Sequence, residues 1–405
     1  MLNPYLLMAL LYLAVGALTA LDASLTSFSL LGWIAGLRWL RVHFITLGVM
    51  TEVIFGVAPT LVALAKGLPR PKMRWDIWLT LNMGLVILLV GIPIINQAMI
   101  FTGGTLIFVA ASLLGWQLWQ MRSPGSARRA ESGSLKFYLT GLSFLLLGIT
   151  IGTGLWLGWS GPLRIQAPLE THIHANNWGF MSLVFAGLLL DVLPGLTGHA
   201  LASKRTVNTI FWGISLGALF LVIGPWLGGN LWFTVPGLVV HLSSTLALLI
   251  LTIRRLSAGG KLAQAGSWHL ITSYLWILAP VMVAPLIILG VPGFPGALIE
   301  ATAPQALIYG WVLQFGMALI PYFARRTFLK DNSGTLGGNW LSVGAANVGS
   351  ALIWAGIFLT GITGQLHGVG YILFAVAMLT VFWEMAGMVR VGLRRLEEFE
   401  GTVGA

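Results

Sequence analysis

Two histidines, His172 and His174, stand one residue apart in the segment HIHANNWGF (172–180), at the start of a long apolar run. The chain has only seven histidines in 405 residues, and an ionisable side chain inside a membrane is costly enough to be a functional candidate. Residues i and i+2 of a helix point about 200° apart, so these two imidazoles cannot bind one metal ion from the same side. Two opposed imidazoles at one depth instead suit axial ligation of two groups, or one ligand and one gating or neighbouring residue.

The elements that must position these histidines are membrane-spanning helices. The chain is 57% hydrophobic and 8% charged, whereas a soluble domain carries about a quarter charged residues. Apolar runs of about 20 residues, each long enough for a transmembrane helix, recur along the whole length. We predict an all-α polytopic membrane protein with twelve spans: 4–24, 40–65, 76–96, 99–121, 136–159, 171–195, 206–227, 231–253, 267–290, 303–324, 340–362 and 367–389. The absence of cysteine excludes disulfides, thiolate ligands and iron–sulfur clusters.

The lysines and arginines sort by loop, which accounts for the net charge of +10 without nucleic acid as a partner. Those that follow the even-numbered spans are Lys66, Arg70, Lys72 and Arg74; Arg122, Arg128, Arg129 and Lys136; Lys204 and Arg205; Arg254, Arg255 and Lys261; Arg325, Arg326 and Lys330; and Arg390, Arg394 and Arg395. The positive-inside rule then predicts that both termini and all even loops are cytoplasmic, in the inner or plasma membrane. The first span lacks a basic head and a small-residue cleavage site, so we expect a span and not a signal peptide.

An internal repeat relates the predicted spans 40–65, 171–195 and 303–324. Each carries a polar residue near its outer end and a glycine five residues further on. The pairs are His43 and Gly48, His174 and Gly179, and Gln305 and Gly310. We therefore predict one transmembrane domain (1–405) made of three four-helix pseudo-repeats. Their ranges are 1–122, 136–255 and 266–395, with a cytoplasmic linker at 123–135.

A haem held edge-on between helices takes an imidazole from each side. His43 is predicted at the same depth as His174, so we predict a bis-histidine haem b with these two residues as axial ligands. His172 would then face a second haem or a metal. Haem propionates need cationic partners, and Arg38 and Arg41 lie one to two turns outside His43. The alternative for the histidines is packing against a backbone carbonyl, and for the arginines it is snorkelling to the interface.

Two further polar residues lie deep in predicted spans. His241 is about ten residues into the span 231–253 and is the candidate ligand for a second metal. Glu52 lies nine residues below His43, where a carboxyl group must be protonated or paired. It could serve a proton path or line the cofactor cleft, or it could simply hydrogen-bond to a neighbouring helix.

The segments around these histidines resemble subunit I of the haem–copper oxidases. THIHANNWGFMSLVFAGLLLDVLPGLTG (171–198) is similar to the His-x-His helix of the C-type oxidases, and RVHFITLGVMTEVIFG (41–56) looks like the helix that supplies the other low-spin ligand. The resemblance implies that His43 and His174 hold a low-spin haem and that His172 holds a high-spin haem. The HIHANNWGF and PGLTGH segments are also similar to the NnrS-type haem proteins of nitric oxide metabolism, which are twelve-helix and histidine-rich.

The chain departs from the oxidase pattern at the copper site. The His-x-His lies on the sixth predicted span and not the tenth, where Gln305 takes its place. The span 206–227 contains no histidine, and no two histidines are adjacent anywhere. Copper or another non-haem metal is therefore doubtful, and a standard terminal oxidase is not expected.

These observations predict an integral membrane haem b protein near the outer face that carries electrons or binds nitric oxide or oxygen. Its expected partners are the lipid bilayer and a redox partner protein or quinone, with or without a larger membrane complex. The first alternative is a gas reductase, an oxidoreductase with a second haem or metal. The second is a twelve-helix secondary transporter without haem, since glycine- and proline-broken helices are also typical of that class.

Overall fold

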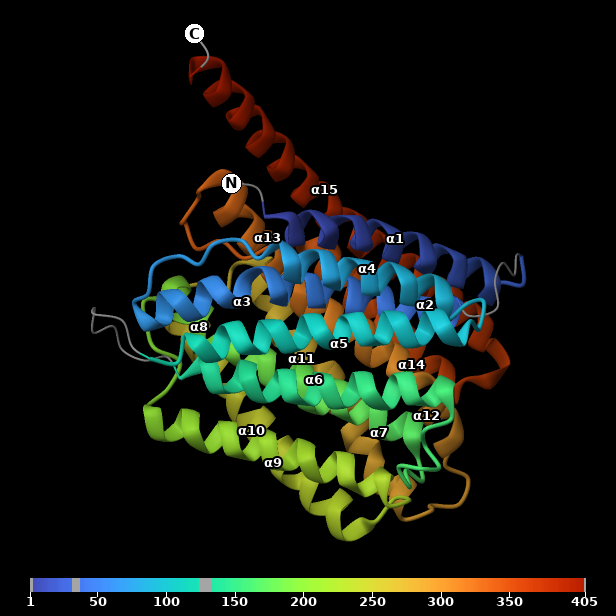
Figure 1. The fold of residues 1–405 in the computed structure, drawn as a ribbon. Helices are drawn as coiled ribbons and strands as arrows, with labels where there is room; N and C mark the ends of the chain where they lie inside the picture. Colours follow the sequence, from blue (N-terminus) through green and yellow to red (C-terminus); the bar gives the residue numbers. More distant parts are fainter. Residues whose placement is uncertain (1–2, 31–36, 124–132, 404–405) are drawn as a thin grey trace. The chain divides into compact units, whose positions relative to one another are not determined.

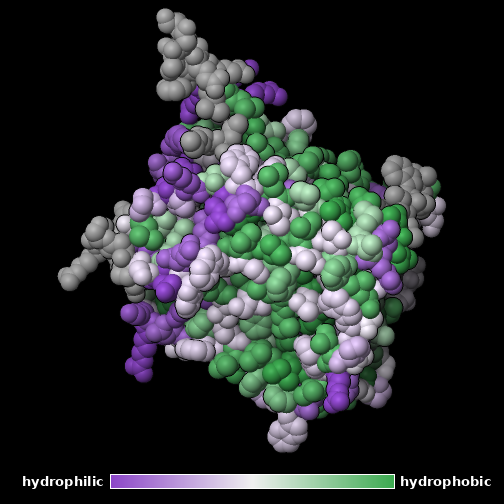
Figure 2. Space-filling model, viewed as in Figure 1, coloured by the Kyte–Doolittle hydropathy of each residue, from purple (hydrophilic) through white to green (hydrophobic). Residues whose placement is uncertain are grey.

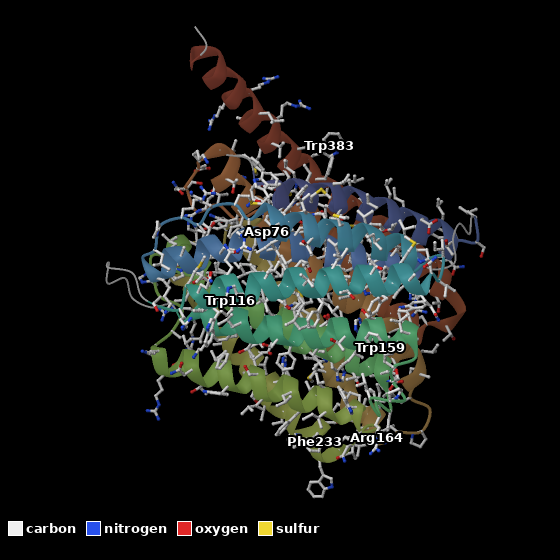
Figure 3. The ribbon with its side chains drawn as sticks, in the orientation of Figure 1. Asp76, Trp116, Trp159, Arg164, Phe233 and Trp383 are labelled. Carbon is white, nitrogen blue, oxygen red and sulfur yellow. The ribbon has the colours of Figure 1, made fainter. Side chains whose placement is uncertain are left out.

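The computed structural model describes residues 3–30, 37–123 and 133–403, and within these ranges all regular elements are helices, with no strand (Figure 1). Eleven helices of this part are long and apolar enough to cross a membrane. Hydrophobic side chains cover much of the surface drawn in Figure 2. The indoles of Trp116 and Trp383, labelled in Figure 3, are 59% and 66% exposed. The protein is therefore a multi-pass helical membrane protein, as the sequence predicts.

The chain forms two compact units. Unit 1 comprises residues 1–56 and 260–405, and unit 2 comprises residues 57–259. The helices of unit 1 are α1 (Pro4–Ser27), α2 (Leu37–His43), η1 (Phe44–Met50), the start of α3 (Thr51–Lys66), α11 (Ala265–Ile288), α12 (Gly296–Leu307), η3 (Ile308–Leu313), α13 (Gln314–Ala324), η4 (Arg325–Leu329), α14 (Trp340–Phe358), η5 (Thr360–Ile362) and α15 (Thr363–Val403). Those of unit 2 are the rest of α3, α4 (Trp75–Gly91), α5 (Gln97–Gln120), α6 (Ser134–Leu157), α7 (Pro168–His174), η2 (Ala175–Met181), α8 (Ser182–Thr197), α9 (Lys204–Trp226) and α10 (Leu231–Ala258).

One predicted span is shorter than expected. The span 76–96 corresponds to α4, which ends at Gly91 and has 17 residues. Pro93 lies two residues after Gly91. Proline lacks an amide hydrogen, and its ring collides with the carbonyl four residues earlier in a helix. A helix of this length covers about 26 Å, less than the hydrocarbon thickness of about 30 Å. The twelfth element is thus an apolar helix below the usual spanning length.

Other ends also differ from the prediction. The span 303–324 is part of a continuous helical stretch from Gly296 to Leu329, and the last span extends from 360 to 395 instead of 367–389. Interior prolines such as Pro304 and Pro321 do not end these helices, because neighbouring helices stabilise them in a membrane. Of the predicted linker 123–135, residues 124–132 lie outside the described residues.

The three spans with the polar residue and glycine each contain a π-helical segment at the same place. These segments are η1, η2 and η3, and they enclose Gly48, Gly179 and Gly310. A Cβ on any of these glycines would lie less than 3.0 Å from an aromatic ring of the first helix in the same predicted block. The rings belong to Tyr12, Phe144 and Trp276. A π-helical segment has about one more residue per hydrogen-bonded turn than an α-helix and is often found at functional sites.

A second contact recurs between the third and fourth helices of each predicted block. A Cβ on the fourth-helix glycine would lie 2.9, 3.1 and 3.1 Å from the carbonyl oxygen of the third-helix glycine in the three blocks. The pairs are Gly103 with Gly84, Gly237 with Gly217, and Gly370 with Gly349. Small residues let membrane helices approach closely. These glycines recur at an almost constant interval in the chain, which is what three related four-helix blocks would produce; the block boundaries stay a prediction.

Candidate functional site

His172 is held by a glycine face of α6 in unit 2. Its Nδ1–H donates to the carbonyl oxygen of Gly148 at 2.8 Å, and a Cβ on Gly152 would lie 2.5 Å from the imidazole Cε1. Asn176, one turn further on, donates to the His172 carbonyl at 2.9 Å and lies against Gly148. Because Gly148 and Gly152 have no side chains, α6 leaves room for the imidazole of His172 and the amide of Asn176.

His174 faces the opposite way, as its spacing from His172 requires. Its Nδ1–H donates to the carbonyl oxygen of Leu221 on α9 at 2.5 Å. The indole of Trp178 lies edge-on to the imidazole, with ring centroids 6.3 Å apart and an interplanar angle of 66°. The hydrogen bond and the indole fix the ring orientation, and a metal would be bound through Nε2.

His43, at the end of α2 in unit 1, has the same hydrogen-bonding pattern. Its Nδ1–H donates to the carbonyl oxygen of Trp39, one turn earlier, at 2.8 Å. The indole of Trp39 stacks on the imidazole with centroids 3.8 Å apart and planes 14° apart. The Nδ1–H tautomer and the ring plane are again fixed, with Nε2 as the coordinating nitrogen for a metal.

Three other histidines form their hydrogen bonds mainly through the opposite nitrogen. His241 bonds the carbonyl of Trp178 through Nε2 at 3.1 Å, and its Nδ1 lies 3.4 Å from the Thr245 hydroxyl. His269 bonds the Ser342 hydroxyl through Nε2 at 2.8 Å, and His367 bonds the Ile353 carbonyl through Nε2 at 3.2 Å. Metal-binding histidines usually donate one ring N–H to a carbonyl or carboxylate and coordinate through the other nitrogen. His43, His172 and His174 share Nδ1–H donation to a carbonyl, so each would coordinate a metal through Nε2, whereas His241 and His367 bond their carbonyls through Nε2.

His241 of α10, the predicted ligand of a second metal, packs against η2, and its role as a ligand stays a prediction. Both of its ring nitrogens have polar neighbours within α10 or on η2, and the residue is only 3% exposed. Its backbone lies against Gly217, and its ring is edge-on to Trp178 with centroids 5.4 Å apart. His241 on α10 therefore contacts both α9 and η2, the segment that directly follows His174.

The two predicted propionate partners differ in their surroundings. The guanidinium of Arg41 lies 5.3 Å from the centre of the Tyr371 ring, and its buried Nε has no hydrogen-bond partner within the described part of the chain. A buried unpaired donor is costly, so this N–H fits an acceptor such as a carboxylate. Arg38 is exposed and donates to the Ala301 carbonyl.

Gln305 takes the place of histidine in the third repeat, and its amide oxygen lies 3.4 Å from the Tyr371 hydroxyl that donates to it. An amide offers no imidazole nitrogen, so the third repeat has no counterpart of His43 and His174 at this position. The link from Gln305 through Tyr371 to Arg41 joins three elements of unit 1. Tyr371 was not predicted from the sequence.

Three acidic residues interact with partners on other helices or loops. Glu52 is fully buried on α3, close enough to Tyr12 of α1 to interact with it electrostatically. Asp191 accepts a hydrogen bond from the Tyr138 hydroxyl at 2.8 Å. Glu384 pairs with Arg325 at 2.9 Å and accepts the Gly338 N–H at 3.0 Å. The proton path suggested for Glu52 stays a prediction.

Among the described residues, no group of three His, Cys, Asp or Glu side chains could hold a metal ion. His43 belongs to unit 1, whereas His172, His174 and His241 belong to unit 2. The pairing of His43 with His174 on one haem therefore stays a prediction from the sequence.

Comparison of the chain with protein-family models found no match, and comparison with curated proteins found none either. The fold and the hydropathy define a class, that of multi-pass helical membrane proteins. The specific function must be argued from the histidines.

Proposed function

We propose that this chain is an integral membrane haem b protein. The observation that carries the proposal is that His43, His172 and His174 each donate Nδ1–H to a backbone carbonyl, at 2.8, 2.8 and 2.5 Å. That arrangement orients the ring and makes Nε2 more basic, as in histidines that bind metals. His43 and His174 are the proposed axial ligands of a low-spin haem, and His172 is the proposed ligand of a second group.

The surroundings of the histidines suit a haem in two further ways. The buried Nε–H of Arg41, two residues before His43, can pair with a propionate. Trp39 and Trp178 supply flat apolar surfaces beside His43 and His174. A haem iron supplies one-electron transfer when both axial positions are filled, and binds a diatomic gas when one is open. The protein would hold the ring nitrogens in one tautomer and shield the group from water.

Electron transfer or gas binding is favoured over gas reduction at a haem–metal pair. A second metal beside the haem needs several ligands, and the sequence has no adjacent histidines and no histidine in the predicted span 206–227. The residue suggested for that role, His241, is engaged at both nitrogens.

The test is the absorption spectrum of the protein purified from cells supplied with haem. We expect reduced-minus-oxidised bands of b-type haem and their loss in His43→Ala and in His174→Ala. His367→Ala is the matched control, because this half-buried histidine bonds its carbonyl through Nε2; it should keep the bands. A colourless wild-type protein would refute the proposal and favour the transporter alternative. Full haem content in both ligand variants would overturn the assignment of His43 and His174 as ligands.

A further inference from the structure

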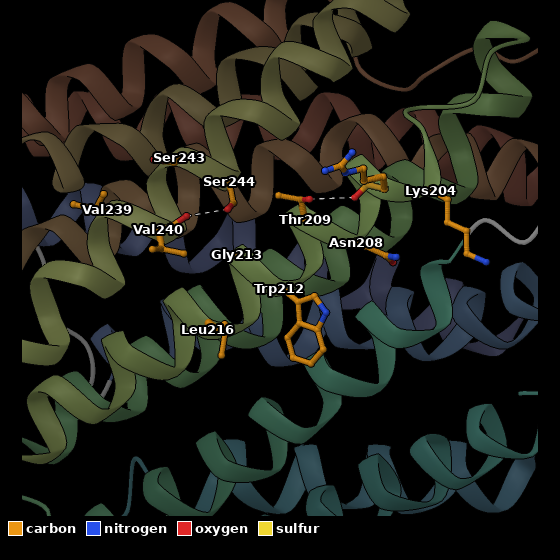
Figure 4. A pocket seen from close by; sticks show the side chains of 11 residues that line it. Lys204, Asn208, Thr209, Trp212, Gly213, Leu216, Val239, Val240, Ser243 and Ser244 are labelled. Carbon is orange, nitrogen blue, oxygen red and sulfur yellow. Dashed lines mark hydrogen bonds between the residues drawn. The ribbon is translucent and has the colours of Figure 1, made fainter.

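A groove of about 840 Å³ runs between α9 and α10 on the surface of unit 2 (Figure 4). One wall is formed by successive turns of α9 and the other by α10. The cationic and the most apolar lining residues are Lys204, Arg205, Trp212, Leu216, Val239 and Val240. Both helices are candidate membrane spans, so the groove faces the bilayer or a molecule that sits in it.

One end of the groove is cationic. Lys204 and Arg205 form the first turn of α9, which contains no acidic residue, and both are exposed. The ammonium of Lys136, at the start of α6, donates to the Asn208 side chain and is close enough to Lys204 to be repelled by it. The start of α9 adds the positive end of a helix dipole. Two cations and the start of a helix therefore lie at this end of the groove, a third cation lies beside Asn208, and the first turn of α9 contains no acidic residue.

The rest of the groove is apolar. Trp212, Leu216, Val239 and Val240 are 59%, 44%, 56% and 39% exposed. The hydroxyl of Ser244 donates to the Val240 carbonyl of its own helix at 2.9 Å. The Thr209 hydroxyl does the same to Arg205 at 3.1 Å, and Figure 4 shows both bonds. These two hydroxyls are satisfied within their helices, so neither leaves an unpaired donor facing an apolar chain.

The order of charge and apolar surface matches a phospholipid. The predicted orientation puts the start of α9 at the cytoplasmic surface, with Lys204 and Arg205 at headgroup level. Leu216 lies about 18 Å further along the helix, close to the roughly 15 Å of hydrocarbon in one leaflet. Basic residues at the membrane surface attract anionic lipids of the cytoplasmic leaflet.

We infer that this groove binds an anionic phospholipid of the cytoplasmic leaflet. Lys204, Arg205 and Lys136 hold its headgroup, and an acyl chain lies along Trp212, Leu216 and the two valines of α10. Gly213 allows this shape, since a Cβ there would collide with the Ser244 side chain and push the two helices apart. The inference does not depend on haem.

The experiment is native mass spectrometry of the full-length protein, with phosphatidylglycerol and phosphatidylcholine of identical acyl chains in equal amounts. The wild type should retain phosphatidylglycerol preferentially. The double variant Lys204→Gln/Arg205→Gln should lower that retention by about 30-fold, because each Lys or Arg near the membrane surface strengthens the binding of an anionic lipid about fivefold. Arg70→Gln/Lys72→Gln is the control: it removes two exposed cations from another loop of unit 2 and should leave the retention unchanged.

A second variant tests the apolar part. Val239→Trp, on an exposed helix position, should fill the groove and reduce lipid retention while the absorption spectrum and the thermal unfolding temperature stay as in the wild type. Equal retention of the two lipids, no effect of the double variant, or occupation of the groove by a second copy of the chain, seen as a dimer that Val239→Trp dissociates, would each overturn the inference.

Discussion

The imidazole of His174, at the end of α7, donates a hydrogen bond of 2.5 Å to the carbonyl of Leu221 on α9. The carbonyl belongs to the backbone, so it stays in place when the histidine side chain is removed. His174 is thus held from outside its own helix, whereas the bond of His43 is to its own helix, one turn back.

This difference predicts a chemical rescue. His174→Gly should lose the b-type bands, and added imidazole should restore them, because the Leu221 carbonyl is still there to orient a free imidazole through one N–H. The measurement is the absorption spectrum against imidazole concentration. His43→Gly is the comparison, and its rescue should be weaker because Trp39 would move into the empty space. Loss of bands in His174→Gly with no recovery at any imidazole concentration would contradict this account.

The glycine face of α6 gives a prediction for His172 alone. Gly152→Ala places a Cβ 2.5 Å from the imidazole Cε1, so the ring must move. Overpacking of this kind costs about 1–3 kcal/mol. We expect a lower thermal unfolding temperature and the loss of any spectral feature that also disappears in His172→Ala, with the His174-dependent bands kept. Gly115→Ala, on α5, is the control, because its Cβ meets nothing closer than 3.9 Å.

His241 should behave as a packing residue and not as a ligand. His241→Ala removes the hydrogen bond to the Trp178 carbonyl and opens a space beside the indole, so we expect a loss of about 1–3 kcal/mol in stability. The haem-to-protein ratio and the content of other metals in the folded fraction should match the wild type. A selective loss of a metal from His241→Ala, at unchanged stability, would instead support the ligand role.

The sequence predicted the helical membrane fold well because hydropathy is a strong signal over 20 residues. It failed at helix ends such as Gly91 and Leu329, where a proline and tertiary packing decide the length. For the site, the spacing of His172 and His174 predicted that they face different helices. Which ring nitrogen each histidine uses depends on carbonyls such as those of Gly148 and Leu221, far away in the chain, and no pattern in the sequence specifies these partners. Tyr371 was missed for the same reason.

The glycine–aromatic contacts yield a last prediction, on the relation between the blocks. If the three blocks are repeats of one unit, Gly48→Ala, Gly179→Ala and Gly310→Ala should each lower stability, because each Cβ would press on an aromatic ring of the first helix in its block. We expect losses of about 1–3 kcal/mol for each, measured by thermal unfolding in detergent. Gly344→Ala, within α14 and with nothing within 4 Å of its Cβ, should be neutral or stabilising, because alanine favours helix by about 1 kcal/mol. Substituting Tyr12→Ala in the Gly48→Ala background should recover part of the loss, because the ring that clashes is gone. A similar cost at Gly344 would show that glycine itself, and not the contact, matters in these helices.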